Sequence, residues 1–202
     1  MYTIDMMLSK GYQIIIKNNL LSDIDSEIKK VYQNKNVYII TDERVGAIYL
    51  QKVKEALSSF SVQTITIKGY EESKSIETYA YLCQRLIELG ATRGELLIAL
   101  GGGVIGDLVG FVASTLYRGM PFVQIPTSLL AQVDSSIGGK TGIDFLGHKN
   151  IIGAFNQPIL VLIDPTVLST LPLTELKNGF GEVIKHALIS SKDLFDLINV
   201  TK

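Results

Sequence analysis

Short runs of β-branched and aliphatic residues alternate with segments of helical periodicity, and this alternation limits the possible folds more than any other feature. The runs that predict strands are YTIDM, YQIIIK, NVYIITD, VQTITIK, ELLIAL, FVQIPT and ILVLID. Between them lie DIDSEIKKVYQ, AIYLQKVKEALSSF and SIETYAYLCQRLIELG, in which apolar residues recur every three or four positions, as in amphipathic helices. Strands that alternate with helices predict an α/β domain with a mainly parallel sheet.

The pattern changes near Leu171. Residues 171–202 contain no strand-like run, and one helical face would align their apolar side chains, which are Phe180, Val183, Ile184, Ala187, Leu188 and Ile198. Such a stripe has to be buried against another surface. We therefore expect an α/β domain over residues 1–170 and the beginning of a truncated all-helical domain over residues 171–202. The alternative is a C-terminal helix that docks back on the sheet domain.

Composition excludes several classes of partner. The chain has 19 basic and 20 acidic residues and a net charge of −1, so it lacks the broad positive field that attracts nucleic acid or an anionic membrane. We find no apolar run near the roughly 18 residues of a membrane span, and no signal peptide at the N-terminus. The single cysteine, Cys83, is interpreted as a core side chain and fits a reducing compartment. We expect a cytoplasmic protein without a nucleic-acid or membrane partner.

A glycine-rich turn follows the predicted strand ELLIAL. In LGGGVIGDLVGF, Gly101, Gly103 and Gly106 match the pattern G-x-G-x-x-G and precede a helix-like segment. Glycines at such a turn let a pyrophosphate approach the backbone, and the helix N-terminus supplies free N–H groups. The acid that usually follows about 20 residues downstream is missing. Asp42, at the end of an earlier strand, would take the adenosine ribose hydroxyls, so the turn favours a dinucleotide.

A phosphate-loop NTPase is the competing interpretation of these glycines. Asp107 occupies the lysine position of that motif at the glycine turn, where a carboxylate would repel a phosphate. A second near match, DSSIGGKT, has Asp134 in place of the first glycine. It follows the helical LLAQVDSS and precedes turn-like GIDFLGHKN, whereas a true phosphate loop joins a strand to a helix. The sequence therefore argues against an NTPase.

Charged and amide side chains gather among glycines after the turn. The segments STLYRGM, DSSIGGKTGID and GHKNIIG contribute Arg118, Asp134, Lys140, Lys149 and Asn150. Glycines beside charged residues are typical of backbone that lies close to a ligand. The grouping predicts a site for a small polyanion.

GEVIKHAL adds Glu182, Lys185 and His186. At helical spacing, Glu182 is a neighbour of both Lys185 and His186, and either pair would form a surface ion pair. Glu182 and His186 would also bind a metal, but two ligands make a poor site. His148 is the only other histidine, so the residues alone predict no self-contained zinc site.

The run GGGVIGDLVGFVASTLYRGMPFVQIPTSLLAQVDSSIGGKTGID, followed by HKNIIGAFNQP, LSTLP and GFGEVIKHAL, resembles the 3-dehydroquinate synthase family. The match extends from about Asp42 to Lys202. It implies a Rossmann-like NAD-binding domain, a helical metal-binding domain, and an active site between them. The implied activity converts 3-deoxy-D-arabino-heptulosonate 7-phosphate to 3-dehydroquinate and phosphate, with transient oxidation by NAD, in the shikimate pathway to aromatic amino acids.

The resemblance also implies roles for individual residues. It assigns the NAD site to Asp42, Glu71, Lys74, Gly102, Gly103, Val104, Ile105, Gly106, Asp107, Thr127, Ser128, Lys140, Lys149, Thr170 and Leu171. It assigns substrate and catalysis to Arg118, Asp134, Lys140, Lys149, Asn150 and Lys185. It makes Glu182 one of three ligands to zinc or cobalt, the other two being histidines that this chain does not contain. It implies a homodimer, because the arginine reaches into a neighbouring subunit's site.

The chain departs from the family in two local positions and in length. Tyr70 and His148 replace usual glycines, and we interpret His186 as a packing or surface residue. Most of the helical domain is missing, so we expect negligible turnover from this chain alone and weak binding of NAD. Three alternatives remain open: a fragment that binds NAD without catalysis, a natural short protein that keeps this domain for binding or regulation, and a glycerol-type polyol dehydrogenase of related fold.

Overall fold

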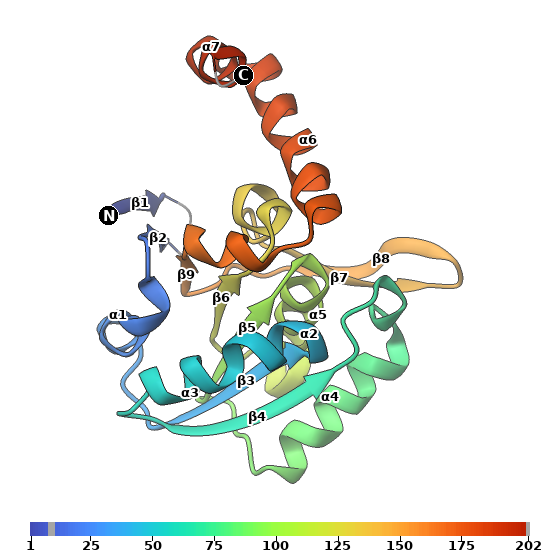
Figure 1. Ribbon diagram of the computed structural model, residues 1–202. Coiled ribbons are helices and arrows are strands. Elements are labelled where there is room, and N and C mark those ends of the chain that lie inside the picture. The colour runs from blue at the N-terminus through green and yellow to red at the C-terminus, as the bar shows by residue number, and fades with distance from the viewer. Residues whose placement is uncertain (8–10, 201–202) are drawn as a thin grey trace.

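The computed structural model describes residues 1–7 and 11–200 (Figure 1). Within these residues one sheet has seven strands, in the order β1-β2-β9-β6-β5-β3-β4. The strands are β1 (Tyr2–Met6), β2 (Tyr12–Ile16), β3 (Asn36–Asp42), β4 (Ser61–Ile67), β5 (Leu96–Gly101), β6 (Phe122–Pro126) and β9 (Leu160–Ile163). Only β1 and β2 pair antiparallel among them, and the other neighbours run parallel. The predicted Rossmann-like α/β fold with a mainly parallel sheet is confirmed.

Helices cover both faces of this sheet (Figure 1). They are α1 (Ile24–Val31), α3 (Gln51–Ala56), α4 (Ile76–Glu88) and α5 (Gly103–Thr115), and two short helical segments, α2 (Glu43–Val45) and η2 (Gly46–Leu50), lead directly into α3. Adjacent strand residues point to opposite faces, so Ile98 packs with α1 and α3 while Leu97 packs with α4 and α5. Each fully buried aliphatic side chain stabilises the fold by about 1.5–3 kcal/mol.

A separate antiparallel hairpin packs against α5. It consists of β7 (Lys140–Phe145) and β8 (His148–Phe155), so the prediction of a turn-like segment at GIDFLGHKN is wrong. The connection uses Leu146 and Gly147, whose φ angles of 49° and 78° are both positive, as a two-residue hairpin turn requires. Close packing on α5 depends on Gly110, where a Cβ would lie 2.4 Å from Thr141 Cγ2.

Shorter helical turns connect these elements. They are η1 (Leu20–Ser22), η3 (Glu71–Ser73), η4 (Leu116–Arg118), the π-helical turn η5 (Ala131–Ser135) and η6 (Pro165–Thr170). At η4 the chain leaves α5 through Tyr117, Arg118 and Gly119, all with positive φ. The turn η5 is important for the site because it follows the carboxyl end of β6.

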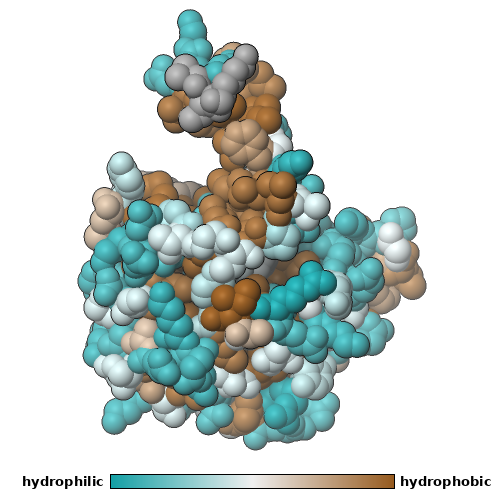
Figure 2. Space-filling view, in the orientation of Figure 1, coloured by the Kyte–Doolittle hydropathy of each residue, from teal (hydrophilic) through white to brown (hydrophobic). Residues whose placement is uncertain are grey.

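The C-terminal helices are α6 (Leu173–Ser190) and α7 (Lys192–Val200). The first half of α6 lies on the body of the molecule, with Gly179 close enough that a Cβ would be 2.5 Å from the Leu130 backbone nitrogen. The second half and α7 extend away from the sheet (Figure 1), and this arm carries apolar side chains on its surface (Figure 2). The alternative of a C-terminal helix that docks back on the sheet domain stays open. The domain division at residue 170 stays a prediction. In the described part of the chain no helix is both long and apolar enough to cross a bilayer.

Candidate functional site

A cleft of about 630 Å³ lies at the carboxyl ends of β3, β5 and β6. This end of a parallel sheet, where the strand order diverges to either side, is the usual ligand position in such folds. The cleft brings together most of the residues predicted to bind the cofactor, which are Asp42, Glu71, Lys74, Gly102, Gly103, Val104, Ile105, Asp107, Thr127, Ser128, Thr170 and Leu171. They come from sequence segments that are far apart, so the fold assembles one cavity from separate motifs.

The N-terminus of α5 opens into this cleft. Gly102 is the N-cap residue, and no side chain caps the helix, so the first amide groups of α5 have no side-chain acceptor. A Cβ at Gly102 would lie 3.4 Å from Ser128 Oγ, and one at Gly103 would lie 3.0 Å from Ser135 Oγ. The glycines therefore leave room beside free N–H groups and a positive helix dipole, which fits the pyrophosphate of a dinucleotide.

Asp42 ends β3 and is buried at the opposite side of the cleft. Its Oδ1 accepts hydrogen bonds from the backbone nitrogens of Arg44 and Val45, at 2.9 and 3.0 Å, and so caps α2. Within residues 1–7 and 11–200, no hydrogen bond engages its Oδ2. The second oxygen is therefore available to accept hydrogen bonds from ribose hydroxyls.

Lys74 forms a buried polar contact between the cleft and the hairpin. Its Nζ lies 2.7 Å from Asp107 Oδ2 and donates to Asn150 Oδ1 on β8. Burial raises the pKa of the Asp107 carboxyl, while the charge of Lys74 acts in the opposite direction. The presence of an acid at position 107 is therefore explained by the structure. Asp107 is the counter-charge of the Lys74 ammonium, which is almost wholly buried.

A second cavity of about 500 Å³ adjoins the first and shares Asp107 and Ser135 with it. Its lining includes Asp134, Lys140 and Asn150, which were predicted to meet the substrate. Lys140 starts β7 and Asn150 lies on β8, so the hairpin forms one wall of this cavity. The arrangement provides one cation and several polar groups next to the cleft.

Other predicted residues lie outside both cavities. Arg118 is exposed on η4. Lys149 pairs with Glu71 at 3.0 Å, and this hydrogen bond raises the pKa of Lys149. Gly106 is buried where a Cβ would lie 2.5 Å from Gln124 Oε1, so its observed role is the packing of α5 on β6. Lys185 pairs with Glu182 on α6, and the hydrogen bond between them raises the pKa of Lys185.

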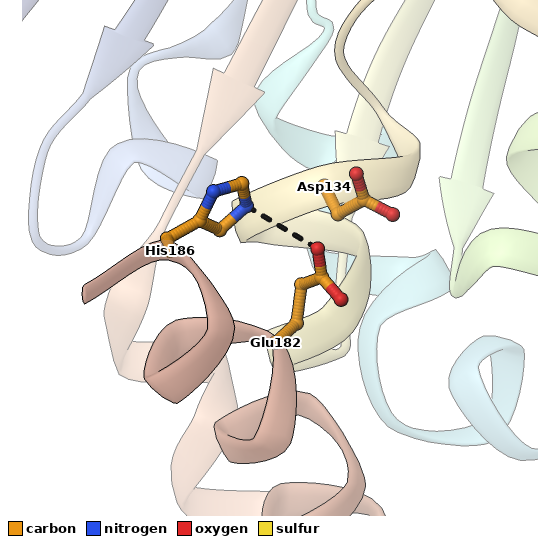
Figure 3. A group of neighbouring side chains, drawn as sticks. All are labelled: Asp134, Glu182 and His186. Carbon is orange, nitrogen blue, oxygen red and sulfur yellow. Dashed lines mark ion pairs between the residues drawn. The ribbon is translucent and has the colours of Figure 1, made fainter. Parts of the chain in front are cut away.

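Three possible metal ligands meet where η5 packs beside α6. One ligand atom each from Asp134, Glu182 and His186 lies within 4.8 Å of the other two (Figure 3). His186 Nε2 is buried and lacks a hydrogen-bond partner, whereas Glu182 Oε1 is paired with Lys185 Nζ. Two carboxylates and an imidazole suit a divalent transition metal. His186 is 45% exposed and its Nε2 lies 3.4 Å from Glu182 Oε1, which agrees with the surface pair expected from the helical spacing.

Sequence reasoning missed several residues of the cleft, and two of them contact each other. Arg44 lies over the Tyr70 ring, 4.6 Å from its centroid, and both side chains line the cleft that also contains Asp42. The sequence marked Tyr70 only as a departure from a usual glycine. Arg44 lies two positions after Asp42, the acid at the end of β3. This spacing would have predicted Arg44 at the same strand end.

Comparison with known proteins gives consistent results. The family profile described as 3-dehydroquinate synthase N-terminal matches residues 64–178. The 3-dehydroquinate synthase of Clostridium botulinum (strain Alaska E43 / Type E3) is 48% identical over 188 residues, which cover 92% of this chain and 54% of that protein. The chain therefore spans about half the length of the curated relatives it matches.

Two solved structures have the same fold. A 2-deoxy-scyllo-inosose synthase complexed with carbaglucose-6-phosphate, NAD+ and Co2+ is 27% identical with a TM-score of 0.86, covering 93% of this chain and 52% of that one. The 2-epi-5-epi-valiolone synthase ValA of Streptomyces hygroscopicus subsp. jinggangensis 5008, with NAD+ and Zn2+ bound, is 31% identical with a TM-score of 0.85, covering 98% and 55%.

Proposed function

The chain belongs to the 3-dehydroquinate synthase family, and from this premise we propose that it forms the NAD-binding part of a carbon–oxygen lyase. The proposed reaction converts 3-deoxy-D-arabino-heptulosonate 7-phosphate to 3-dehydroquinate and phosphate in the cytoplasmic shikimate pathway. One observation carries the proposal. The dinucleotide-sized cleft and the cation-bearing cavity share Asp107 and Ser135, so a cofactor in the first would lie against a polar substrate in the second.

Each part of the cleft has a role in binding NAD. The uncapped amides of α5 would donate hydrogen bonds to the pyrophosphate. Asp42 would accept hydrogen bonds from the adenosine ribose, and its charge would disfavour a 2′-phosphate there. Thr170 and Leu171, at the η6 side of the cleft, would lie near the nicotinamide.

The second cavity would hold the sugar phosphate. Lys140 would neutralise an anionic group of the substrate, and Asn150 would hydrogen-bond its hydroxyls. Lys74 would hold Asn150 and Asp107 in position through its contacts with both side chains. Fixing the substrate beside the cofactor supplies the orientation on which such reactions depend.

The implied cofactors would supply chemistry that side chains lack, namely hydride transfer for NAD and polarisation of a hydroxyl oxygen for zinc or cobalt. Glu182 would hold the metal on α6. Arg118 is exposed and outside both cavities, which supports a homodimer in which it contributes to the site of a second copy. Because the chain spans about half the length of its relatives, we propose that it binds NAD without measurable turnover.

Calorimetric titration with NAD tests the proposal. The unmodified chain should bind NAD, and Gly102→Ala should weaken binding by about tenfold or more, because the new methyl group occupies the position of closest approach to the pyrophosphate. The Cβ makes only an ordinary contact with Ser128 Oγ, so the fold should persist. Gly181→Ala is the matched control, since its Cβ has no neighbour within 4 Å. Equal affinities of the two variants would contradict the assigned pyrophosphate position.

A further inference from the structure

We propose that Ser135 is a cofactor-binding residue, whose hydroxyl donates a hydrogen bond to the pyrophosphate of NAD where the cleft meets the second cavity. The inference rests on the proposed function, because it concerns the dinucleotide of that same cleft. It adds a residue that neither the sequence patterns nor the family resemblance assigned to the site.

Ser135 lies in the wall between the two cavities. Of the described residues that line them, Asp107 and Ser135 are the two that belong to both. The Asp107 carboxylate is engaged by Lys74 Nζ, 2.7 Å away, and an ionised carboxylate accepts hydrogen bonds but donates none. Of the two shared side chains, Ser135 is therefore the one that can donate to an anionic ligand at this junction.

The hydroxyl is also available for a ligand. Ser135 Oγ is shielded from solvent and, across residues 1–7 and 11–200, no hydrogen bond engages it. Most buried polar groups in folded proteins are paired, so this oxygen gains from any partner that reaches it. Rotation about χ1 between staggered positions redirects a serine oxygen without moving the backbone, and such a rotation can turn Oγ toward the cleft.

The N-terminus of α5 lies directly beside this oxygen. A Cβ at Gly103, the first residue of α5, would be 3.0 Å from Ser135 Oγ. The Gly106 amide is bonded to the Gly102 carbonyl at 3.0 Å, so the amides of residues 103–105 precede this first helical hydrogen bond. The hydroxyl and these amides can therefore share one ligand. A pyrophosphate has enough acceptor oxygens for both, and hydrogen bonds to a charged acceptor are the strong ones.

The turn that carries Ser135 is anchored before any ligand binds. In η5 the Ser136 amide donates to the Ala131 carbonyl at 3.1 Å, the five-residue spacing of a π turn. Gln132 Nε2, which is buried, donates to the carbonyl oxygens of Pro126 and Asp164 at 3.2 and 3.1 Å. These bonds attach η5 to the carboxyl ends of β6 and β9. Ser135 is thus held in place by its backbone while its hydroxyl stays uncommitted, and π turns are frequent at functional sites.

Ser136 provides an internal comparison. Its Oγ is also buried without a hydrogen-bond partner in the described part of the chain, but the residue is 2% exposed and lines neither cavity. An unpaired hydroxyl alone therefore does not mark a binding residue. Ser135 differs from Ser136 in its access to both cavities and its position beside α5.

Calorimetric titration of the unmodified chain, Ser135→Ala and Ser136→Ala with NAD and with ADP-ribose tests the proposal. Ser135→Ala should weaken the binding of both ligands by about tenfold, the loss expected for one hydrogen bond to a charged group. ADP-ribose should be affected as much as NAD, because it keeps the pyrophosphate and lacks only the nicotinamide. Ser136→Ala is the matched control and should bind both ligands as the unmodified chain does.

Urea denaturation of the same variants separates binding from a structural role. Each substitution removes a hydroxyl that has no partner in the protein, so neither should lower the urea midpoint. A lower midpoint in Ser135→Ala alone would show that the protein itself holds this hydroxyl, and would overturn the inference.

The outcomes also separate this inference from the proposed function. Equal NAD affinity of Ser135→Ala and the unmodified chain, or an equal loss in Ser136→Ala, would reject the role of Ser135 while the cleft still binds NAD. A loss for NAD without one for ADP-ribose would place the hydroxyl on the nicotinamide half and reject the pyrophosphate contact. Absence of NAD binding by the unmodified chain would instead reject the proposed function.

Discussion

At the scale of single residues, the buried pair Lys74–Asp107 supports both cavities. The side chains are 5% and 18% exposed, so removal of one partner leaves a charge with little access to water. We predict that Lys74→Met lowers the free energy of unfolding by about 3 kcal/mol, as for other broken buried pairs. Urea denaturation measures the change. Glu71→Gln, which breaks the exposed pair with Lys149, is the control and should have little effect.

The same pair predicts a dependence of stability on pH. The pKa of Asp107 is raised above its ordinary value of 3.8, chiefly by burial. Just above that pH the folded state keeps a proton that the unfolded chain has lost, so the contribution of Asp107 to stability falls as pH rises through this window. Lys74→Met removes the charge that counteracts the shift, and the fall should therefore extend to higher pH. Urea midpoints from about pH 4 to pH 7 measure it; parallel curves for the two proteins would contradict the assignment.

Cys83 offers a simpler residue-scale prediction. Burial raises the pKa of its thiol, so a smaller fraction is thiolate at any given pH, and the thiolate is the reactive form. We predict that iodoacetamide modifies Cys83 more slowly in the folded chain than in urea at the same pH. The ratio of the two rates, followed by mass spectrometry, checks this. Equal rates would mean that the thiol is neither shielded nor shifted.

At the scale of elements, the main sheet could be predicted because its strands are short β-branched runs bounded by turns. The β7–β8 hairpin could not. Its turn uses Leu146 and Gly147 instead of the Asn-Gly or Asp-Gly that usually marks a two-residue turn, and Gly142 and Gly153 interrupt the alternation of apolar residues. Glycine places no apolar side chain on either face of a strand, so a strand that contains it lacks the period-two pattern on which sequence prediction depends.

Those two glycines make the hairpin a sensitive element. Gly142 and Gly153 are paired across the strands, and a Cβ at Gly153 would lie 2.2 Å from the Thr141 carbonyl oxygen. We predict that Gly153→Ala destabilises the chain by about 2 kcal/mol, as overpacking does elsewhere, measured by urea denaturation. Gly181→Ala, on the open face of α6, should instead stabilise it by about 0.5–1 kcal/mol. A neutral Gly153→Ala would show that the strands can separate without cost.

The candidate site, like the fold, contains some features that are local in the sequence and others that form only through tertiary packing. The glycine turn and Asp42 could be predicted because each is a short motif at the end of a strand, where a parallel sheet gathers its ligand contacts. The cluster of Asp134, Glu182 and His186 could not, because it needs the packing of η5 on α6. The sequence showed only that Glu182 and His186 share a helix, and no pattern connects these two side chains with Asp134.

At the scale of the whole molecule, the arm formed by α6 and α7 presents an apolar surface to solvent (Figure 2). Leu188, Ile189 and Leu197 are 67%, 73% and 65% exposed. Contiguous apolar surface of this kind is typical of a face that other protein covers. The chain spans about half the length of its relatives, and a longer family member has further chain with which to cover such a face.

In the chain by itself, we predict that this arm drives self-association. Sedimentation velocity over a range of protein concentrations should show a weight-average mass that rises with concentration. Leu188→Glu should reduce the association by placing a charge in the apolar surface, whereas Leu173→Glu should not, because Leu173 is 64% exposed at the opposite end of α6. A monomer at every concentration would contradict this role of the arm. Association that persists in Leu188→Glu would point to another face, and the exposed Arg118 turn would then be the next surface to vary.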